Sequence, residues 1–401
     1  MDNRRCILDK FTVEPLQRMR KSHTYRTLRH LESPEASHVL IDGKRTLLLA
    51  SNSYLDLANV DELKQAMASA VMEWGTGSGG ARLTTGNKSP HDELEQTIAK
   101  FKGEEAAITF NTGYMANVGV ISALCGKEDF IFSDALNHAS IIDGIRLSRA
   151  HCSVYKHNDM ADLICAIEAA KAEFQASGKS SNEFRGMIVT DAVFSMDGDL
   201  ANLPELLRIA REHELLLMID EAHATGVIGK TGRGLAEHYG CEHADVTVGT
   251  LSKAVAAEGG FVAGRRELIE FLKNKSRSFI FTTAMAPAVA AAASCNLKYI
   301  DAHPERVRML QENVEFFCNA LRSKGLNIPQ TQSAIVPIVV GDEAKALDVS
   351  AKLLEKGILI PAIRYPTVAK GEARLRASLM ATHTREELQF AACEIAKEFF
   401  G

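Results

Sequence analysis

The stretch Asp245-Val-Thr-Val-Gly-Thr-Leu-Ser-Lys253-Ala-Val255 has the pattern of a short buried strand followed by a turn of small residues that carries one lysine. A second apolar run, Leu215-Leu-Leu-Met-Ile-Asp220-Glu-Ala-His223, ends in an acid with a histidine three residues later. Because parallel strands end at the same edge of a sheet, we expect Lys253 and Asp220 to lie in one crevice.

Two upstream segments complete this pattern. Phe110-Asn-Thr-Gly113-Tyr114 ends a strand-like run and opens a helical one, and Leu136-Asn-His138 presents a histidine among small residues. Pyridoxal phosphate needs a lysine for a Schiff base, an acid beside its ring nitrogen and backbone N–H donors for its phosphate. A lone lysine, acid or histidine in such a setting is more often structural, so only their combination predicts a pyridoxal-phosphate site.

Strand-like and helix-like segments alternate from residue 130 to residue 265, which predicts a mostly parallel sheet with helices on both faces. The expected strands are 106–110, 130–132, 152–155, 186–190, 215–219, 246–248 and 260–263. Asp191 and Ser195 also follow strands, so both are expected in the same crevice as Asp220 and Lys253.

The chain has 401 residues, of which 46% are hydrophobic, enough for about two domains. We expect a helical arm and hairpin over 1–50, a large cofactor-binding domain over 51–290 and a small C-terminal α+β domain over 291–401. The first 35 or so residues are expected to be helical, and residues 358–363 to form one strand. The three arginines between 364 and 376 either bind a carboxylate or belong to a solvated edge hairpin.

Composition argues against several classes of function. The net charge is −5 and no basic stripe appears, which disfavours a nucleic-acid partner. The longest run of small apolar residues, Ala284 to Ala293, contains Pro287 and is far shorter than the roughly 18 residues of a membrane span. The eight cysteines form no Cys-x-x-Cys pair and no zinc spacing, so we expect reduced thiols, no metal site and a cytoplasmic protein.

Six motifs together resemble those of the α-oxoamine synthases, which are fold-type I pyridoxal-phosphate transferases. The motifs are Ser51-Asn-Ser-Tyr54-Leu, Gly75-Thr-Gly-Ser-Gly-Gly-Ala-Arg-Leu-Thr-Thr-Gly86, Leu136-Asn-His-Ala-Ser140, Val193-Phe-Ser-Met-Asp-Gly198, Asp220-Glu-Ala-His-Ala-Thr-Gly226 and Gly249-Thr-Leu-Ser-Lys-Ala254. The resemblance covers nearly the whole chain. It implies an α/β fold of type I, pyridoxal phosphate as cofactor and a homodimer with a shared active site.

Two runs, at 83–87 and 362–368, are most similar to the biotin-pathway branch of this family. Members of that branch condense L-alanine with pimeloyl-CoA, or with the pimeloyl carrier protein, and release CO2. Tyr365 stands where the branch usually has proline, and its Tyr-Pro pair resembles 2-amino-3-ketobutyrate CoA ligase, which uses glycine and acetyl-CoA. That sister activity is the alternative. Glu221 also departs from the usual motif, and is expected not to touch the cofactor ring.

The resemblance assigns a role to each site residue. It implies that Lys253 holds the cofactor and acts as the base, while Asp220 and His223 bind the ring nitrogen and the ring oxygen. His138 is expected to stack on the ring and to contact substrate. The further cofactor contacts that it implies are Gly113, Tyr114, Ser195, Thr250 and, from the partner subunit, Thr282 or Thr283. The implied substrate contacts are Arg364 and Asn52 for the alanine carboxylate, Arg26 for the distal pimeloyl carboxylate, and Thr367.

Two other classes of protein share this fold. A pyridoxal aminotransferase normally lacks the His138 and Thr-Thr-Gly patterns, and its turnover leaves a pyridoxamine form that absorbance detects. A regulator that binds the cofactor without turnover would usually carry an added DNA-binding domain or have lost site residues. The sequence shows neither an added DNA-binding domain nor a loss of site residues.

Overall fold

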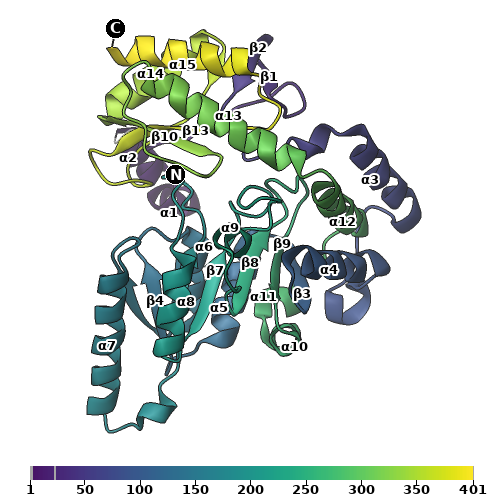
Figure 1. Ribbon diagram of the computed structural model, residues 1–401, viewed down its shortest axis with the longest axis vertical. Coiled ribbons are helices and arrows are strands. Elements are labelled where there is room, and N and C mark those ends of the chain that lie inside the picture. Colours follow the sequence, from purple (N-terminus) through teal and green to yellow (C-terminus); the bar gives the residue numbers. More distant parts are fainter. Residues whose placement is uncertain (1–2, 22–23, 401) are drawn as a thin grey trace.

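A computed structural model describes residues 3–21 and 24–400, so the parts of the predicted arm and small domain at residues 1, 2, 22, 23 and 401 lie outside it. Its centre is a seven-stranded sheet (Figure 1). In spatial order the strands are β3 (Ala106–Phe110), β9 (Gly260–Gly264), β8 (Val246–Thr250), β7 (Leu216–Asp220), β6 (Gly186–Asp191), β4 (Phe130–Asp134) and β5 (His151–Tyr155). All neighbours from β8 to β5 are parallel, and β9 is antiparallel to both β3 and β8, which confirms the predicted mostly parallel sheet.

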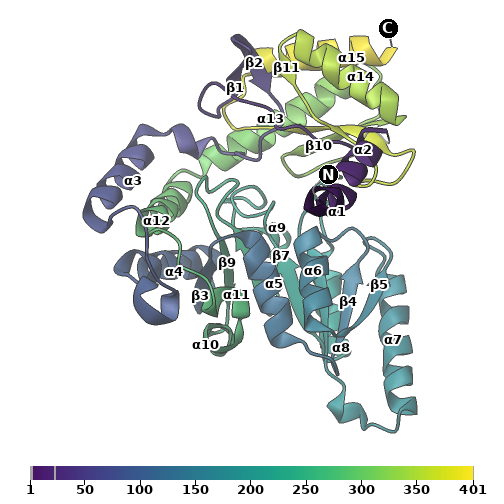
Figure 2. The same ribbon diagram turned by 180° about the vertical axis from the view of Figure 1, so that it is seen from behind.

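Helices cover both faces of this sheet because its strands are apolar on both sides. On β6, Met187 and Val189 join the core that also contains residues of α5 (Gly113–Leu124) and α6 (Ala139–Ser148). Ile188, between them, joins the opposite core with α7 (Met160–Ala176) and α8 (Leu203–Glu212). Figures 1 and 2 show these two helical layers from opposite sides.

Two small sheets complete the β structure. One contains β1 (His38–Ile41), β2 (Lys44–Leu48) and β11 (Ile358–Leu359), and the other β10 (Ile335–Gly341), β13 (Ala373–Ser378) and β12 (Ala362–Ile363). The N-terminal hairpin therefore pairs with a strand from the far end of the chain (top of Figure 2). The packing around these sheets comes from α13 (Glu305–Arg322), α14 (Glu343–Glu355) and α15 (Arg385–Phe400). The predicted domain limits at 50 and 290 stay a prediction.

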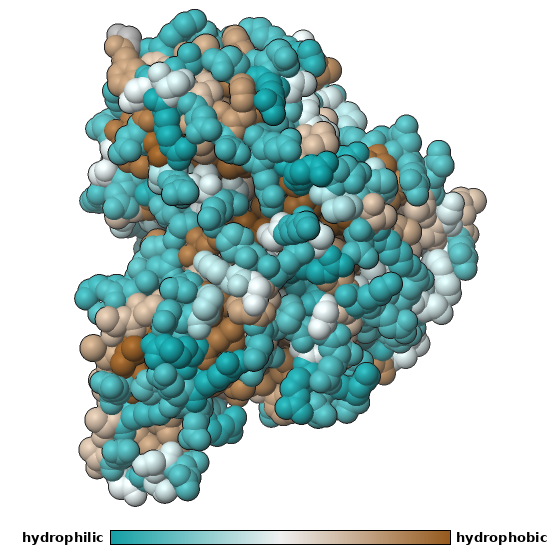
Figure 3. Space-filling view, viewed as in Figure 1, coloured by the Kyte–Doolittle hydropathy of each residue, from teal (hydrophilic) through white to brown (hydrophobic). Residues whose placement is uncertain are grey.

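The other helices lie at the N-terminus, beside β3 and between the sheets. They are α1 (Asn3–Phe11), α2 (Val13–Lys21), α3 (Asp61–Trp74), α4 (Ser89–Lys102), α9 (Leu235–Tyr239), α10 (Arg266–Lys275), α11 (Arg277–Ile280) and α12 (Pro287–Ala302). Helix α12 packs on both α3 and α4. In the described ranges, none of the helices combines the length and the apolar character that crossing a bilayer requires. The face shown in Figure 3 is mostly hydrophilic, with apolar residues in scattered patches.

Two local expectations were wrong. Residues 358–363 form two strands in different sheets, because Ile358–Leu359 pairs with β2 whereas Ala362–Ile363 pairs with β13. The described residues from 24 to 37 contain no helix. Leu28 is fully exposed there, so no apolar face packs to stabilise one.

The prediction that these arginines belong to a solvated edge hairpin is also wrong for Arg374 and Arg376, the two arginines of β13. This strand lies between β10 and β12 and is not an edge strand. Arg374 and Arg376 are only 5% and 6% exposed. Arg374 pairs with Asp197, which lies in the loop after β6. The β13 arginines therefore bind the small sheet to the large one.

A buried ion pair lies behind the end of β7. Lys102 contacts Glu221, and the two residues are 1% and 4% exposed. The second oxygen of Glu221 accepts a hydrogen bond from the Leu235 amide at 2.9 Å. Glu221 thus points away from its neighbour Asp220, as expected for a residue that does not serve the cofactor.

Replacing Lys102 with Ala leaves a buried carboxylate without its cation. We expect the free energy of unfolding to fall by about 3–5 kcal/mol, measured by denaturant titration. The matched control is Lys64→Ala, since Lys64 forms an exposed ion pair with Asp61 and such pairs contribute about 0–1 kcal/mol. Equal effects of the two substitutions would contradict the prediction.

Candidate active site

A cavity of about 200 Å³ lies where β6, β7 and β8 end. Parallel strands bring their carboxyl ends to this edge of the sheet, and the following loops supply the polar residues. Its lining consists of Thr112, Gly113, Tyr114, Asn117, His138, Ser140, Asp191, Ser195, Asp220, Ala222, His223, Thr250, Ser252 and Lys253. The structure thus brings together nearly all residues predicted to hold the cofactor.

Lys253 lies in the turn after β8 and is half-buried. Burial lowers the pKa of its amine and the Arg376 guanidinium lowers it further, while the Asp220 carboxylate, and Asp191 when it is ionised, oppose the shift. The net direction is downward. A neutral amine is therefore available closer to neutral pH than for an ordinary lysine, as a nucleophile or a base requires.

Asp220 ends β7, is 4% exposed and has a fixed orientation. Asn117 Nδ2 donates to its Oδ2 at 2.6 Å, and the Ala222 amide donates to its Oδ1 at 2.9 Å. Asp191 lies directly opposite on β6. Burial, together with the Asp220 charge, raises the pKa of Asp191 well above its usual range, so Asp191 tends to keep a proton.

His223 is 7% exposed, and its Nδ1 lies 2.7 Å from the Tyr54 hydroxyl. Burial lowers the pKa of His223 well below its ordinary value, with Lys253 and Arg376 adding to the effect. Burial raises the pKa of Tyr54 to about 12, so Tyr54 keeps its proton. His223 is therefore a neutral imidazole that can hydrogen-bond a ligand oxygen.

One end of the cavity is suited to an anion. It is formed by the N-terminus of α5, where Thr112 caps the helix by accepting a hydrogen bond from the Met115 amide. Thr250 and Ser252 add hydroxyl groups from the turn after β8. Gly113 lets Thr250 lie close to the helix start, since a Cβ at this position would approach Thr250 Cβ to 3.3 Å. Free N–H groups at a helix N-terminus, with the helix dipole and nearby hydroxyl groups, favour the binding of a phosphate group.

These residues fit pyridoxal phosphate. The cavity offers a lysine of lowered pKa, a fixed carboxylate for a ring nitrogen, a neutral histidine for a ring oxygen and an anion seat. His138 is exposed at the cavity, with its amide donating to Asp191 Oδ2 at 2.7 Å. Tyr114 is 46% exposed, and its hydroxyl donates to Asp143. In the described ranges, His, Cys, Asp and Glu form no cluster that could hold a metal ion.

Of the predicted substrate residues, His138 lines this cavity and the other four do not. Arg26, Arg364 and Thr367 line a second cavity of about 310 Å³. Asn52 lines neither cavity, but its Oδ1 lies 3.1 Å from the Tyr54 hydroxyl. The roles of these residues stay predictions.

Thr282 and Thr283 do not line the lysine cavity of their own chain. Thr282 lines a small pocket beside Arg82, and Thr283 forms a β-bridge with Ala81. Their predicted contact with a partner's cofactor stays a prediction.

Sequence reasoning missed Asn117, and it did not single out Arg376 among the three arginines between 364 and 376. Asn117 lies one turn into α5, where it orients Asp220, and its signal was a buried amide in an apolar helix. Arg376 donates from Nε to the Ser195 carbonyl and from Nη2 to Asn52 Oδ1 at 3.2 Å. Its signal was the alternation Ala373-Arg-Leu-Arg-Ala-Ser378, in which arginines interrupt an apolar strand.

Comparison with known proteins identifies the family of this chain. The family model of class I and II aminotransferases matches residues 44–395. The chain belongs to this family. It is 52% identical over 388 residues to a putative 8-amino-7-oxononanoate synthase of Desulfovibrio desulfuricans, covering 96% of this chain and 98% of the relative. It is 44% identical over 382 residues to the 8-amino-7-oxononanoate synthase of Thermoanaerobacter pseudethanolicus, covering 95% and 94% of the two chains.

A solved structure has the same fold. It is serine palmitoyltransferase of S. paucimobilis with a bound PLP–myriocin aldimine, which is 31% identical at a TM-score of 0.89 over 98% of both chains. The relatives thus agree with the fold type and with the family resemblance seen in the motifs.

The lowered pKa of Lys253 predicts how fast its amine reacts. Without cofactor, the pH midpoint for labelling of Lys253 by an amine reagent is expected below the ordinary lysine value, as measured by peptide mass spectrometry. Asp220→Asn removes a charge that raises the pKa and should lower the midpoint further, whereas Arg376→Gln should raise it. The exposed Lys127 calibrates the reagent in each digest. Shifts of the opposite sign would contradict this electrostatic account.

Proposed function

We propose that this protein is a pyridoxal-phosphate-dependent acyltransferase that condenses L-alanine with a pimeloyl thioester. The products are 8-amino-7-oxononanoate, CO2 and the free thiol of CoA or of a carrier protein, a step of biotin biosynthesis. The observation that carries the proposal is the placement of Lys253 and Asp220 in one cavity. The near full-length similarity to 8-amino-7-oxononanoate synthases supports this choice of reaction.

The residues that would hold the cofactor have distinct tasks. Lys253 would carry it covalently until L-alanine displaces the lysine amine, and Asp220 would bind its ring nitrogen and His223 its ring oxygen. The N-terminus of α5, with Gly113, Tyr114 and Thr250, would bind its phosphate. When bound, the cofactor supplies an electron sink for the negative charge that develops at the substrate Cα. Ser195 and His138 would complete the contacts around the ring.

Lys253 is then the proton carrier of the reaction. Its amine of lowered pKa removes the Cα proton of alanine, and that carbon attacks the thioester carbonyl. A C–C bond forms, and the C–S bond breaks with release of the thiol. The former alanine carboxylate leaves as CO2, and Lys253 or His138 returns a proton to the same carbon. Because the amine is deprotonated at lower pH than an ordinary lysine, it serves as a base near neutral pH.

Two carboxylates must be held in this reaction, and the chain offers two sites for them. Arg376 lies beside Lys253 and His223, and it contacts Asn52 and Ser195. We assign the alanine carboxylate to Arg376, in place of the Arg364 that the family resemblance implied.

The second site is the cavity that contains Arg26, Arg364 and Thr367. It suits the distal pimeloyl carboxylate, since guanidinium groups bind carboxylates in a fixed two-pronged geometry. An acetyl group has no distal carboxylate and would leave this cavity unused.

The proposal includes a homodimer, in which Thr282 or Thr283 reaches the cofactor of the partner subunit. Both lie outside the lysine cavity of their own chain, which agrees with such a role. It also includes a cytoplasmic location, consistent with the free thiols of the seven cysteines from Cys125 to Cys393. The large domain is proposed to span residues 51–290 and the small one residues 291–401.

The proposal is tested with two substrate pairs. The protein loaded with cofactor should turn over L-alanine with pimeloyl-CoA much faster than glycine with acetyl-CoA, as measured by release of free thiol. The Lys253→Ala variant should show neither turnover nor a borohydride-reducible visible band. Faster turnover of glycine with acetyl-CoA would instead support the 2-amino-3-ketobutyrate CoA ligase activity, to which the Tyr365-Pro366 pair is similar.

Replacing the arginines of the second cavity should separate the two substrates. Arg26→Gln and Arg364→Gln are each expected to raise KM for pimeloyl-CoA at least about tenfold, the size of a lost hydrogen bond to a charged group. KM for L-alanine should change little. Lys370→Gln is the control, since it removes an exposed positive charge that lies over the Tyr365 ring. An equal rise in both KM values would contradict the assignment.

A further inference from the structure

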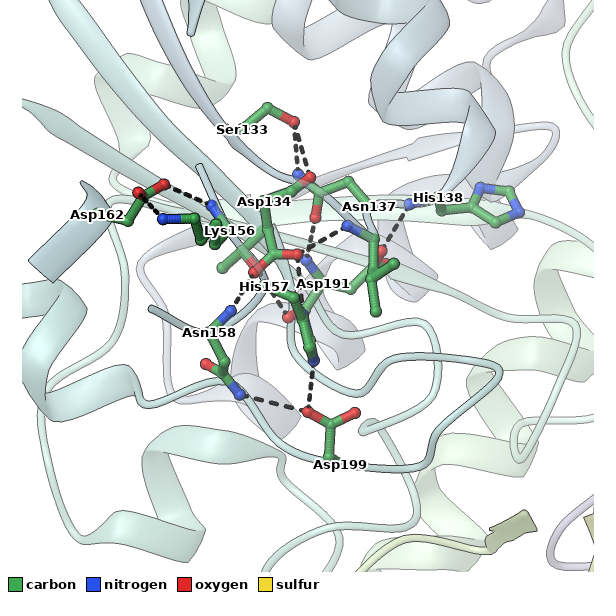
Figure 4. A network of polar contacts seen from close by, with 12 residues as sticks. Ser133, Asp134, Asn137, His138, Lys156, His157, Asn158, Asp162, Asp191 and Asp199 are labelled. Atoms are coloured by element: carbon green, nitrogen blue, oxygen red, sulfur yellow. Dashed lines mark hydrogen bonds and ion pairs between the residues drawn. The ribbon is translucent and has the colours of Figure 1, made fainter. Parts of the chain in front are cut away.

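His157 lies between two carboxylates that come from different strand ends. Its Nδ1 is 3.0 Å from Asp134 Oδ1, at the end of β4, and its Nε2 is 2.9 Å from Asp199 Oδ2, in the loop after β6 (Figure 4). The Phe194 ring packs edge-on against the imidazole, with ring centroids 4.3 Å apart. Asp134, His157, Phe194 and Asp199 line neither the lysine cavity nor the cavity that contains Arg26.

Both ring nitrogens of His157 must carry a proton in this arrangement. A neutral imidazole has one N–H donor and one acceptor nitrogen, whereas a carboxylate only accepts. Two carboxylate partners are therefore both satisfied only by the imidazolium form. The geometry by itself identifies His157 as a cation within a carboxylate–imidazolium–carboxylate bridge.

The two ends of this bridge lie next to the residues of the cavity. Asp134 Oδ1 also accepts a hydrogen bond from the Leu136 amide at 2.8 Å, two residues before His138. Asp199 closes the turn that carries Ser195, since its carbonyl accepts from the Phe194 amide at 3.1 Å. The Asp134 carboxylate thus fixes the loop that leads to His138, and the Asp199 backbone fixes the loop that carries Ser195.

We propose that His157 is a positioning residue that, as a cation, ties the loop carrying His138 to the loop carrying Ser195. It touches neither cofactor nor substrate, and it acts by holding these two residues at a fixed separation across the cavity. The inference rests on the proposed function only in naming what the cavity binds. The bridge itself belongs to the chain without any ligand.

The charges around His157 keep the imidazolium stable. Asn158 reinforces both ends, with its amide donating to Asp134 Oδ2 at 2.9 Å and its Nδ2 to Asp199 Oδ2 at 3.3 Å. The neighbouring Lys156 is paired with Asp162 at 2.8 Å and so adds little unbalanced positive charge. Among the described residues, the charged side chains in contact with the ring are therefore the two carboxylates.

The pKa of His157 agrees with this geometry. Partial burial lowers it, but the hydrogen bonds and charges of Asp134 and Asp199 outweigh burial and raise the pKa to about 10. Since the folded pKa lies above the unfolded one, the bridge stabilises the loops fully below the ordinary histidine pKa. The stabilisation is lost as the pH rises through about 10.

The charge state is tested first, on the full-length protein without added ligand. In ¹⁵N-labelled protein, the His157 ring should give the signals of an imidazolium from pH 6 to pH 9, with the assignment made by the His157→Gln variant. Titration of His157 near its ordinary value would overturn the proposal. This measurement does not depend on whether the protein binds pyridoxal phosphate.

The positioning role is tested by cofactor titration, followed by visible absorbance. His157→Gln keeps a polar side chain but loses the charge and one donor, so the dissociation constant of pyridoxal phosphate should rise at least about tenfold. Lys156→Ala, an exposed neighbour that bridges no loops, should bind like the wild type. Equal affinities of the wild type and His157→Gln would overturn the proposal.

Asp199→Asn distinguishes charge from shape, and it remains informative if His157→Gln fails to fold. Removing one carboxylate lowers the pKa of His157, so the ratio of the variant's dissociation constant to that of the wild type should rise between pH 6 and pH 9. A merely structural role predicts a ratio independent of pH and would overturn the proposal. If the wild type binds no cofactor, the proposed function fails, and the charge-state measurement still decides the inference.

Discussion

The candidate active site depends on the electrostatic coupling between the Lys253 amine and the Asp220 carboxylate at the ends of neighbouring parallel strands. Asp220 ends β7, and Lys253 lies in the turn after β8. Burial alone would lower the pKa of Lys253 strongly, and the nearby carboxylates limit that shift. The amine is thus held close to the range in which one group can act as both nucleophile and base.

The fixed position of Asp220 brings it close to a second acid, Asp191, and the surrounding structure reduces the resulting charge repulsion. Asp191 is forced next to it by the parallel register of β6 and β7, and two like charges at that distance would repel. The rise in the pKa of Asp191 removes most of that repulsion. Behind the strand end, Glu221 turns away to Lys102, so a third acid adds its charge to a separate, neutralised pair. Of the two neighbouring acids, Asp220 therefore lines the cavity, whereas Glu221 belongs to a buried ion pair.

The C-terminal part of the chain contributes to the cavity through β13. Arg376 reaches the Ser195 carbonyl, and Arg374 pairs with Asp197 in the same loop. On the other side of that loop, Asp199 is bound by His157. The short segment from Ser195 to Asp199 is thus held by the large sheet and the small sheet together. Any shift of one sheet against the other would move Ser195, which lines the cavity.

The sequence by itself determined the parallel sheet, the cofactor type and the convergence of Asp191, Ser195, Asp220 and Lys253, because these follow from local patterns. An apolar run marks a strand, and parallel strands end together whatever the rest of the chain does. Resemblance to the family motifs supported the cofactor and added the substrate class. This resemblance can be recognised without knowing where the residues lie in space. Only the tertiary structure decided the contacts of Asn117, His157 and Arg376, the break of residues 358–363 into two strands, and the placing of Arg364 and Lys253 in different cavities. Each of these depends on contacts between residues far apart in the chain, and a local pattern carries no information about such contacts.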